Sequence, residues 1–202
     1  RMKNGEFCPD QFQEKANNPQ IKMFELKLAQ GAKIRGGHVE GSKVNPEIAK
    51  IRGVTPWKNV DSPNRHNEFH DMISLFDFID YLRELGGKPI GIKIVMGGPD
   101  SAEELAQTMA QTGRGPDAIT IDGGEGGSGA TYQEMADTMG LPVKSGLIHL
   151  DNALRKYGVR NRVKVFASGK LFSPDKIAIT LSMGADLINI ARGMMISVGC
   201  IG

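Results

Sequence analysis

The sequence has few cysteines and few aromatic residues, and it contains no long apolar run and no run of like charges. Its two cysteines, Cys8 and Cys200, stand near opposite ends of the chain, which excludes the closely spaced framework of a disulfide-rich secreted domain. No apolar stretch reaches the roughly 20 residues of a membrane-spanning helix, and no signal peptide is apparent. We therefore expect a cytoplasmic protein with no membrane partner.

The net charge and the length of the chain further restrict the class of protein. The net charge is +2, and the aromatic residues make up only 6% of the chain and are scattered, so we expect no nucleic-acid partner. The 202 residues are 40% hydrophobic and 24% charged, as in ordinary globular domains. A chain of this length builds one core, or at most two small ones.

Apolar and alternating segments predict an α/β protein. Five strands are expected at residues 21–29, 89–96, 117–122, 163–167 and 186–191. Helices are expected at residues 9–17, 46–52, 75–85, 102–112, 145–157 and 174–183, and another after Thr131. Ser74, Ser101 and Thr131 are the predicted N-caps of three of these helices. Strands and helices alternate, which predicts a parallel sheet with right-handed crossovers.

The segment from Asp122 to Ala130 reads Asp-Gly-Gly-Glu-Gly-Gly-Ser-Gly-Ala and directly follows a buried apolar strand. Glycine at five of these positions would let the backbone approach a ligand closely. The segment is not a Walker A loop, because no Gly-Lys-Ser/Thr follows, and it lacks the Gly-x-Gly-x-x-Gly opening of a dinucleotide fold. We expect Glu125 to accept hydrogen bonds from backbone N–H groups.

Polar and glycine residues occur near the carboxyl ends of all five predicted strands, at residues 30–33, 93, 122–129, 168–170 and 192–193. An open doubly wound sheet would concentrate its ligand residues at one switch point, whereas a barrel distributes them over many strand ends. We therefore predict a (β/α)₈ TIM barrel. Because a barrel needs eight strands, about three N-terminal strands are expected upstream of this chain.

Other candidate residues have ordinary explanations. His66 and His70 lie in an irregular segment without cysteines or carboxylates at the spacing of a metal site, so they predict no metal centre. Met194 and Met195 are expected in the core.

Five segments resemble the FMN-binding domain of glutamate synthase and its stand-alone relatives, the glutamate synthase-related proteins. They are Glu-Leu-Lys-Leu-Ala-Gln-Gly-Ala-Lys at 25–33, Val-Asn-Pro-Glu-Ile-Ala-Lys-Ile-Arg-Gly at 44–53, residues 122–130, Ala-Ser-Gly-Lys at 167–170, and Ala-Arg-Gly-Met at 191–194 leading to Cys200. The resemblance covers nearly the whole chain. It implies that residues 1–202 are a partial FMN-binding barrel domain, running to the start of an iron–sulfur loop.

The resemblance also implies an activity. Reduced FMN would deliver hydride to 2-iminoglutarate, made from 2-oxoglutarate and ammonia or glutamine-derived nitrogen. An electron-donor subunit and a glutaminase subunit are the expected partners, because this chain contains no glutaminase domain.

Residue roles follow from the same resemblance. Lys33 and Arg52 would hold the carboxylates of 2-oxoglutarate, and Lys33, Gln30 and Lys93 would be the catalytic residues. Cys200 would be the first of three cysteines that ligate a 3Fe-4S cluster, which only a longer chain would complete. The expected FMN-binding residues are Gln30, Lys93, Asp122, Gly123, Gly124, Gly126, Gly127, Gly129, Ser168, Gly169, Arg192 and Gly193.

One departure keeps alternatives open. The family loop commonly reads Pro-Gly-x-Gly-Gly, whereas residues 34–38 read Ile-Arg-Gly-Gly-His, one residue shorter before Lys43. The difference favours a related FMN oxidoreductase with another substrate, such as an N-methylglutamate synthase subunit. A third hypothesis is a non-catalytic barrel fragment that packs against a partner subunit. We expect the isolated chain to bind flavin weakly or not at all.

Overall fold

The structure is a computed structural model that describes residues 2–3, 6–31, 38–61, 65–126 and 138–200. It divides into two compact units. The first unit comprises residues 1–24 and 35–89, and the sheet unit comprises residues 25–34 and 90–202.

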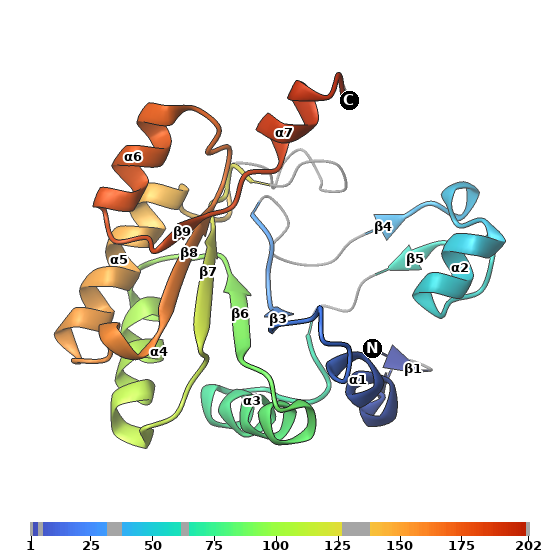
Figure 1. The fold of residues 1–202 in the computed structure, drawn as a ribbon, viewed down its shortest axis with the longest axis horizontal. Helices are drawn as coiled ribbons and strands as arrows, with labels where there is room; N and C mark the ends of the chain where they lie inside the picture. Colours follow the sequence, from blue (N-terminus) through green and yellow to red (C-terminus); the bar gives the residue numbers. More distant parts are fainter. Residues whose placement is uncertain (1, 4–5, 32–37, 62–64, 127–137, 201–202) are drawn as a thin grey trace. The chain divides into compact units, whose positions relative to one another are not determined.

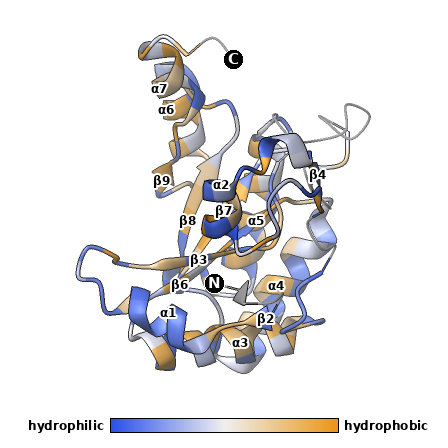
Figure 2. Ribbon diagram, turned by 90° about the vertical axis from the view of Figure 1, so that its right-hand side faces the viewer, coloured by the Kyte–Doolittle hydropathy of each residue, from blue (hydrophilic) through white to orange (hydrophobic). Residues whose placement is uncertain are grey.

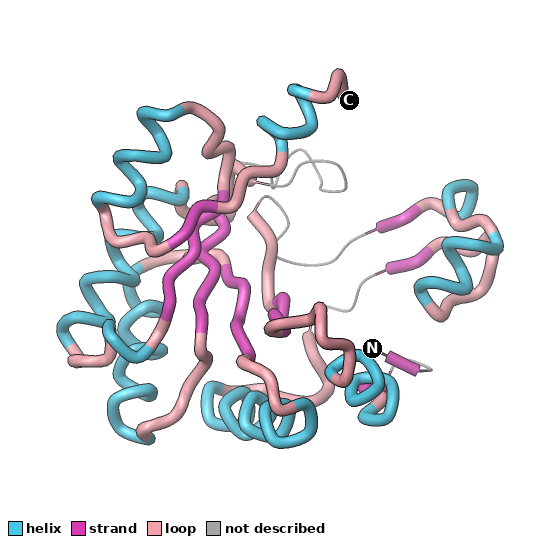
Figure 3. The backbone as a smooth tube through the Cα atoms, in the orientation of Figure 1, coloured by secondary structure: helices cyan, strands magenta, loops and turns pink. Residues whose placement is uncertain are grey.

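A five-stranded sheet in the order β3-β6-β7-β8-β9 organises the sheet unit (Figures 1 and 3). The strands are β3 (Phe24–Lys27), β6 (Ile90–Ile94), β7 (Ala118–Asp122), β8 (Lys164–Ser168) and β9 (Leu187–Ile188). The pairs from β6 to β9 are parallel, and the register places Lys93 beside Thr120 and Asp122 beside Ser168. All five predicted strands are confirmed: four have shorter bounds, and β8 has the predicted length but is shifted by one residue.

The two faces of this sheet differ in chemistry, because successive side chains of a strand point to opposite faces. Figure 1 shows α4 (Pro99–Thr112) and α5 (Val143–Lys156) covering one face of the sheet. Ile119 and Ile121 are fully buried on this face, where a Cβ on Gly146 of α5 would lie 3.4 Å from Ile121 Cγ2. The residues between and after them, Thr120 and Asp122, lie on the other face. The polar side chains of β7 therefore lie on one face, and Asp122 stands at the carboxyl end of the strand.

Among the described helices, three start earlier than predicted. Helix α5 begins at Val143 and not at Ser145. Helix α4 begins at Pro99 after Gly98, and Ser101 is not its cap. Proline suits the first helical position because its ring fixes φ and its missing N–H would be unsatisfied there in any case. Helix α3 (Met72–Gly86) is capped by Asp71, and Ser74 is the third helical residue of a reciprocal capping box rather than the cap itself.

The first unit is built on α1 (Pro9–Ala16) and α3, which pack together. Aromatic rings pack against both helices: between ring centroids, Phe7 lies 5.3 Å from Phe78 of α3, and Phe12 of α1 lies 4.4 Å from Phe24. The unit also contains α2 (Pro46–Arg52), the 3₁₀ turn Gly41–Lys43, and two antiparallel pairs that were not predicted: β1 (Met2–Lys3) with β2 (Glu6–Phe7), and β4 (His38–Val39) with β5 (Val60–Asp61).

Exposed apolar side chains gather toward the C-terminus, on α6 (Pro174–Ser182), β9 and α7 (Arg192–Ser197), where Figure 2 shows apolar ribbon. Met194 and Met195 are 62% and 50% exposed, so their predicted place in the core is wrong. Among the described residues, no helix is both long enough and apolar enough to span a membrane.

Candidate functional site

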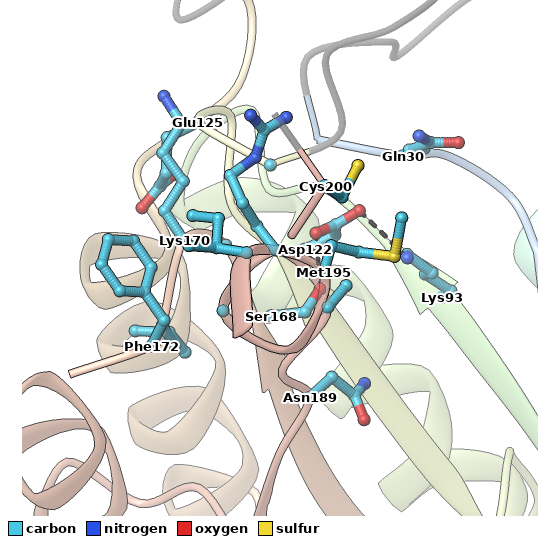
Figure 4. Close-up of a pocket in the computed structure, with 17 residues that line it drawn as sticks. Gln30, Lys93, Asp122, Glu125, Ser168, Lys170, Phe172, Asn189, Met195 and Cys200 are labelled. Carbon is cyan, nitrogen blue, oxygen red and sulfur yellow. Dashed lines mark hydrogen bonds and ion pairs between the residues drawn. The ribbon is translucent and has the colours of Figure 1, made fainter. Parts of the chain in front are cut away.

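A pocket of about 850 Å³ opens at the carboxyl ends of β6, β7, β8 and β9 (Figure 4). Nine of the residues predicted from sequence line it: Gln30, Lys93, Asp122, Gly126, Ser168, Gly169, Arg192, Gly193 and Cys200. The strand-end rule of parallel α/β proteins therefore located the site.

Asp122 connects three elements at the floor of this pocket. Its Oδ2 lies 3.1 Å from Lys93 Nζ, and it accepts a hydrogen bond of 3.0 Å from the backbone N–H of Gly31. Its Oδ1 accepts a hydrogen bond of 2.5 Å from the hydroxyl of Ser168. The carboxylate thus ties β7 to β6, to β8 and to the segment that follows β3. Figure 4 shows the ammonium of Lys93 directed at it.

The backbone after β3 passes very close to the glycine segment. A Cβ on Gly31 would lie 2.5 Å from the carbonyl oxygen of Gly123 and would overlap the carbonyl oxygen of Gly126. Only glycine fits at this position without a shift of the backbone. The approach places the preceding residue, Gln30, at the pocket wall.

Backbone hydrogen bonds hold the described part of the glycine segment in place. The N–H of Gly123 donates to Ser168 O at 2.8 Å, and the N–H of Gly124 donates to Leu141 O at 2.9 Å. Gly126 closes a turn onto Gly123 O at 2.8 Å and lines the pocket. Gly123 and Gly124 are buried and are not among the lining residues. Gly127 and Gly129 lie outside the described residues.

Glu125 accepts the N–H of Val143 with both carboxylate oxygens, at 3.0 and 3.1 Å. Val143 is the first residue of α5, so the carboxylate lies at the positive end of that helix dipole. The expectation that Glu125 serves backbone N–H groups is confirmed.

The other side of the pocket is built from two turns. Gly169 has φ 140° and the next residue, Lys170, has φ 50°, a region that residues other than glycine seldom occupy. Gly193 lies at the start of α7, where a Cβ would come within 2.7 Å of Phe172 Cβ. Three cationic side chains line the pocket, Lys93, Lys170 and Arg192. Its chemistry therefore suits an anionic ligand that meets backbone at close range.

Several lining residues were not predicted. Lys170 was among the polar residues at the predicted strand ends but was given no binding role. Asn189 follows the end of β9, so the same strand-end signal could have identified it. An apolar portion that no sequence motif indicated is added by Leu171, Phe172, Met195 and Ile196.

The predicted 2-oxoglutarate pair is not part of this pocket as described. Lys33 lies outside the described residues. Arg52 belongs to the first unit, where it is the exposed last residue of α2 before Gly53 ends the helix with φ 70°. Its predicted role therefore stays a prediction.

Cys200 is half-buried at the pocket, and its N–H donates to Met195 O at 3.0 Å. Within the described ranges, no group of three or more histidines, cysteines or carboxylates could hold a metal ion. The predicted cluster, which needs cysteines outside this chain, stays a prediction.

Comparison with solved structures concerns the fold alone. The chain resembles a variant of flavocytochrome b2 with pyruvate bound, with a TM-score of 0.57 at 14% identity, over 96% of this chain and 42% of that one. The parallel sheet and its helices thus have the arrangement of part of an α/β barrel, and the predicted fold class is confirmed. The five described strands form an open portion of such a barrel.

Relatives found by sequence share a higher identity with this chain than the solved structure does. The chain is 56% identical over its whole length to a glutamate synthase large subunit-like protein of Bacillus subtilis, of which it covers 38%. It is 32% identical over 88% of its length to the archaeal glutamate synthase [NADPH] of Methanocaldococcus jannaschii, of which it covers 34%. The chain thus spans little more than a third of either relative. Residues 14–202 match the conserved region in glutamate synthase, and the chain therefore belongs to the glutamate synthase family.

Proposed function

We propose that this chain is the larger part of an FMN-binding barrel in a flavin-dependent oxidoreductase of the glutamate synthase type, which converts 2-oxoglutarate to glutamate through 2-iminoglutarate. The observation that carries the proposal is the pocket itself. It combines a lysine fixed at a strand end, glycine turns on the opposite wall, and cations suited to an anionic ligand.

The residues present fit FMN. The cavity of about 850 Å³ lies within the ordinary range for cofactor sites. In Figure 4, Lys93 and Gln30 lie on one side of the pocket and Lys170 and Phe172 lie on the other. Such an arrangement suits a flavin ring beside Lys93 and a single phosphate at the turns of Gly169, which has φ 140°, and Gly193, where a Cβ would lie 2.7 Å from Phe172 Cβ.

When bound, FMN would supply the redox chemistry, and the chain's own residues would bind and orient the flavin and the substrate. Lys93 would place a positive charge at the N1/O2 edge of the ring, where negative charge develops on reduction. Gln30 would lie beside the ring. Lys33 and Arg52 would pair with the two carboxylates of 2-oxoglutarate, because guanidinium and ammonium groups suit a dicarboxylate.

The rest of the proposed enzyme would lie outside these 202 residues. Remaining barrel strands would complete the pocket, and cysteines after Gly202 would join Cys200 at a 3Fe-4S cluster. Partner subunits would deliver electrons and ammonia or glutamine-derived nitrogen in the cytoplasm.

The test uses the full-length protein loaded with FMN and reduced under anaerobic conditions. Addition of 2-oxoglutarate and ammonium should restore the visible absorbance of oxidised flavin and form an equal amount of glutamate. Reoxidation by methylamine with 2-oxoglutarate, but not by ammonium, would instead identify a related oxidoreductase with another substrate. A protein that binds flavin in no condition would be a non-catalytic barrel fragment.

A further inference from the structure

The carboxylate of Asp122 is almost completely enclosed, with its side chain 5% exposed. Both oxygens are used: Oδ2 faces Lys93 Nζ at 3.1 Å and Gly31 N at 3.0 Å, and Oδ1 accepts from Ser168 Oγ at 2.5 Å. Gly126 closes over it as well, since a Cβ there would lie 2.7 Å from Oδ1. These contacts leave little of the carboxylate open to a ligand, although Asp122 lines the floor of the pocket.

Lys93, in contrast to Asp122, is accessible from the pocket. Its side chain is 22% exposed and lines the pocket, so its ammonium faces Asp122 while it stays accessible from the cavity. A lysine ammonium is carried on four methylene groups with free rotation and is a point charge without a preferred direction. A pocket that depends on the position of this charge needs a second group to fix it.

The same carboxylate also holds Gly31, the residue after Gln30. It therefore controls two of the groups that would face the flavin, one through an ion pair and one through the backbone. Ser168, at the end of β8, fixes the carboxylate in turn.

We propose that Asp122 is a positioning residue, which holds the ammonium of Lys93 and the backbone beside Gln30 in the geometry that receives the flavin, and does not itself contact the ligand. This role rests on the proposed function and refines it. In this role, the position of the positive charge beside the flavin depends on the ion pair of Lys93 with Asp122 and not on Lys93 alone.

The chain provides a matched control on the same face of the same strand. Thr120 is 1% exposed, and its hydroxyl donates to Glu25 Oε2 rather than to any pocket residue. Thr120 is the cross-strand neighbour of Lys93, and Thr120→Ser changes β7 at this position while both members of the ion pair stay in place.

The first measurement needs no ligand. Acetic anhydride is added to the full-length protein, and mass spectrometry follows acetylation of each lysine. In Asp122→Asn, Lys93 should react roughly three- to tenfold faster than in the wild type, because an ion-paired amine attacks the reagent slowly. The exposed Lys164 should be unchanged in both proteins, which controls for the amount of active reagent, and Thr120→Ser should leave Lys93 at the wild-type rate.

The second measurement is a double-mutant cycle on FMN affinity. Lys93→Met and Asp122→Asn should each weaken FMN binding by roughly tenfold, and the double variant should be little weaker than either one, because both changes remove the same pair. Thr120→Ser should bind FMN as the wild type does.

Equal acetylation of Lys93 in the wild type and in Asp122→Asn would overturn the positioning role, and so would fully additive losses of FMN affinity. If none of the proteins binds FMN, including the wild type, the proposed function fails, while the acetylation result still decides whether Asp122 holds Lys93.

Discussion

Arg160 and Asp186 form an ion pair of 3.0 Å at the amino ends of β8 and β9, the end of the sheet opposite the pocket. Arg160 Nε also lies 2.7 Å from Asp151 Oδ1, and its other nitrogens donate to the carbonyls of Val163 and Gly184. The guanidinium thus joins α5 to the segments that enter two strands. In barrels, this end of the sheet serves stability and the carboxyl end serves chemistry.

Arg160→Met should destabilise the protein without altering the pocket. Its side chain is only 14% exposed, and removing it leaves buried Asp151 with a weaker set of partners. We expect a loss of about 3 kcal/mol in the free energy of unfolding, or a melting temperature lower by roughly 6–12 °C. Thermal unfolding of the variant measures this. Arg155→Met, which removes a 63% exposed partner of the same carboxylate, is the control and should cost less. Equal costs would contradict the account.

Gly31→Ala tests the close approach at the pocket floor. The added methyl group would collide with the backbone carbonyls of Gly123 and Gly126, which cannot rotate away as a side chain could. We expect a loss of roughly 2–4 kcal/mol in stability, together with weaker FMN binding. Gly97→Ala is the control, since a Cβ there meets nothing within 4 Å. Denaturant unfolding that gives similar stabilities for the two variants would show that the approach is looser than described.

Asp71 should titrate below its ordinary pKa of 3.8. Hydrogen bonds from the side chain and then the backbone N–H of Ser74 lower the pKa of this carboxyl. Because the folded pKa is depressed, the cap stabilises α3 above pH 3.8, and its contribution is lost as the pH falls through the lower folded value. Carboxyl NMR titration should show Ser74→Ala moving the Asp71 midpoint toward 3.8.

Asp175 is the control for this titration, because the side chain of Ser173 lowers the pKa of Asp175 independently. A wild-type Asp71 midpoint at or above 3.8 would show that the capping box does not hold the carboxylate.

Most of the sheet could be predicted from sequence because strand patterns are local. Residues 117–122 and 163–167 are apolar runs bounded by turns, and the structure places β7 and β8 there. The two-residue strands β4 and β5 are too short to show any period. Helix α7 was missed because its apolar residues are exposed and show no helical face.

The residues that line the site could be predicted from sequence, but the contacts between them could not. The rule that chemistry follows parallel strand ends located Gln30, Lys93, Asp122 and Ser168. It did not show that Asp122 receives Lys93, because that pairing depends on the register between β6 and β7, which single-strand patterns do not fix.

Lys33→Met and Arg52→Met test the proposed substrate. Each would remove a charge-assisted contact worth on the order of 1.5–3 kcal/mol, so 2-oxoglutarate affinity should fall roughly ten- to a hundredfold while the flavin spectrum is unchanged. Lys58→Met, which removes another exposed cation of the first unit, is the control. Unchanged 2-oxoglutarate binding in both variants would point to another substrate.

The identity of the bound flavin tests the central proposal most directly. The full-length protein is purified, its flavin is released by acid, and the product is separated by chromatography against FMN and FAD standards. We predict FMN alone, because the cations and glycine turns suit one phosphate. Released FAD, or a colourless protein that FMN cannot reconstitute, would contradict the account.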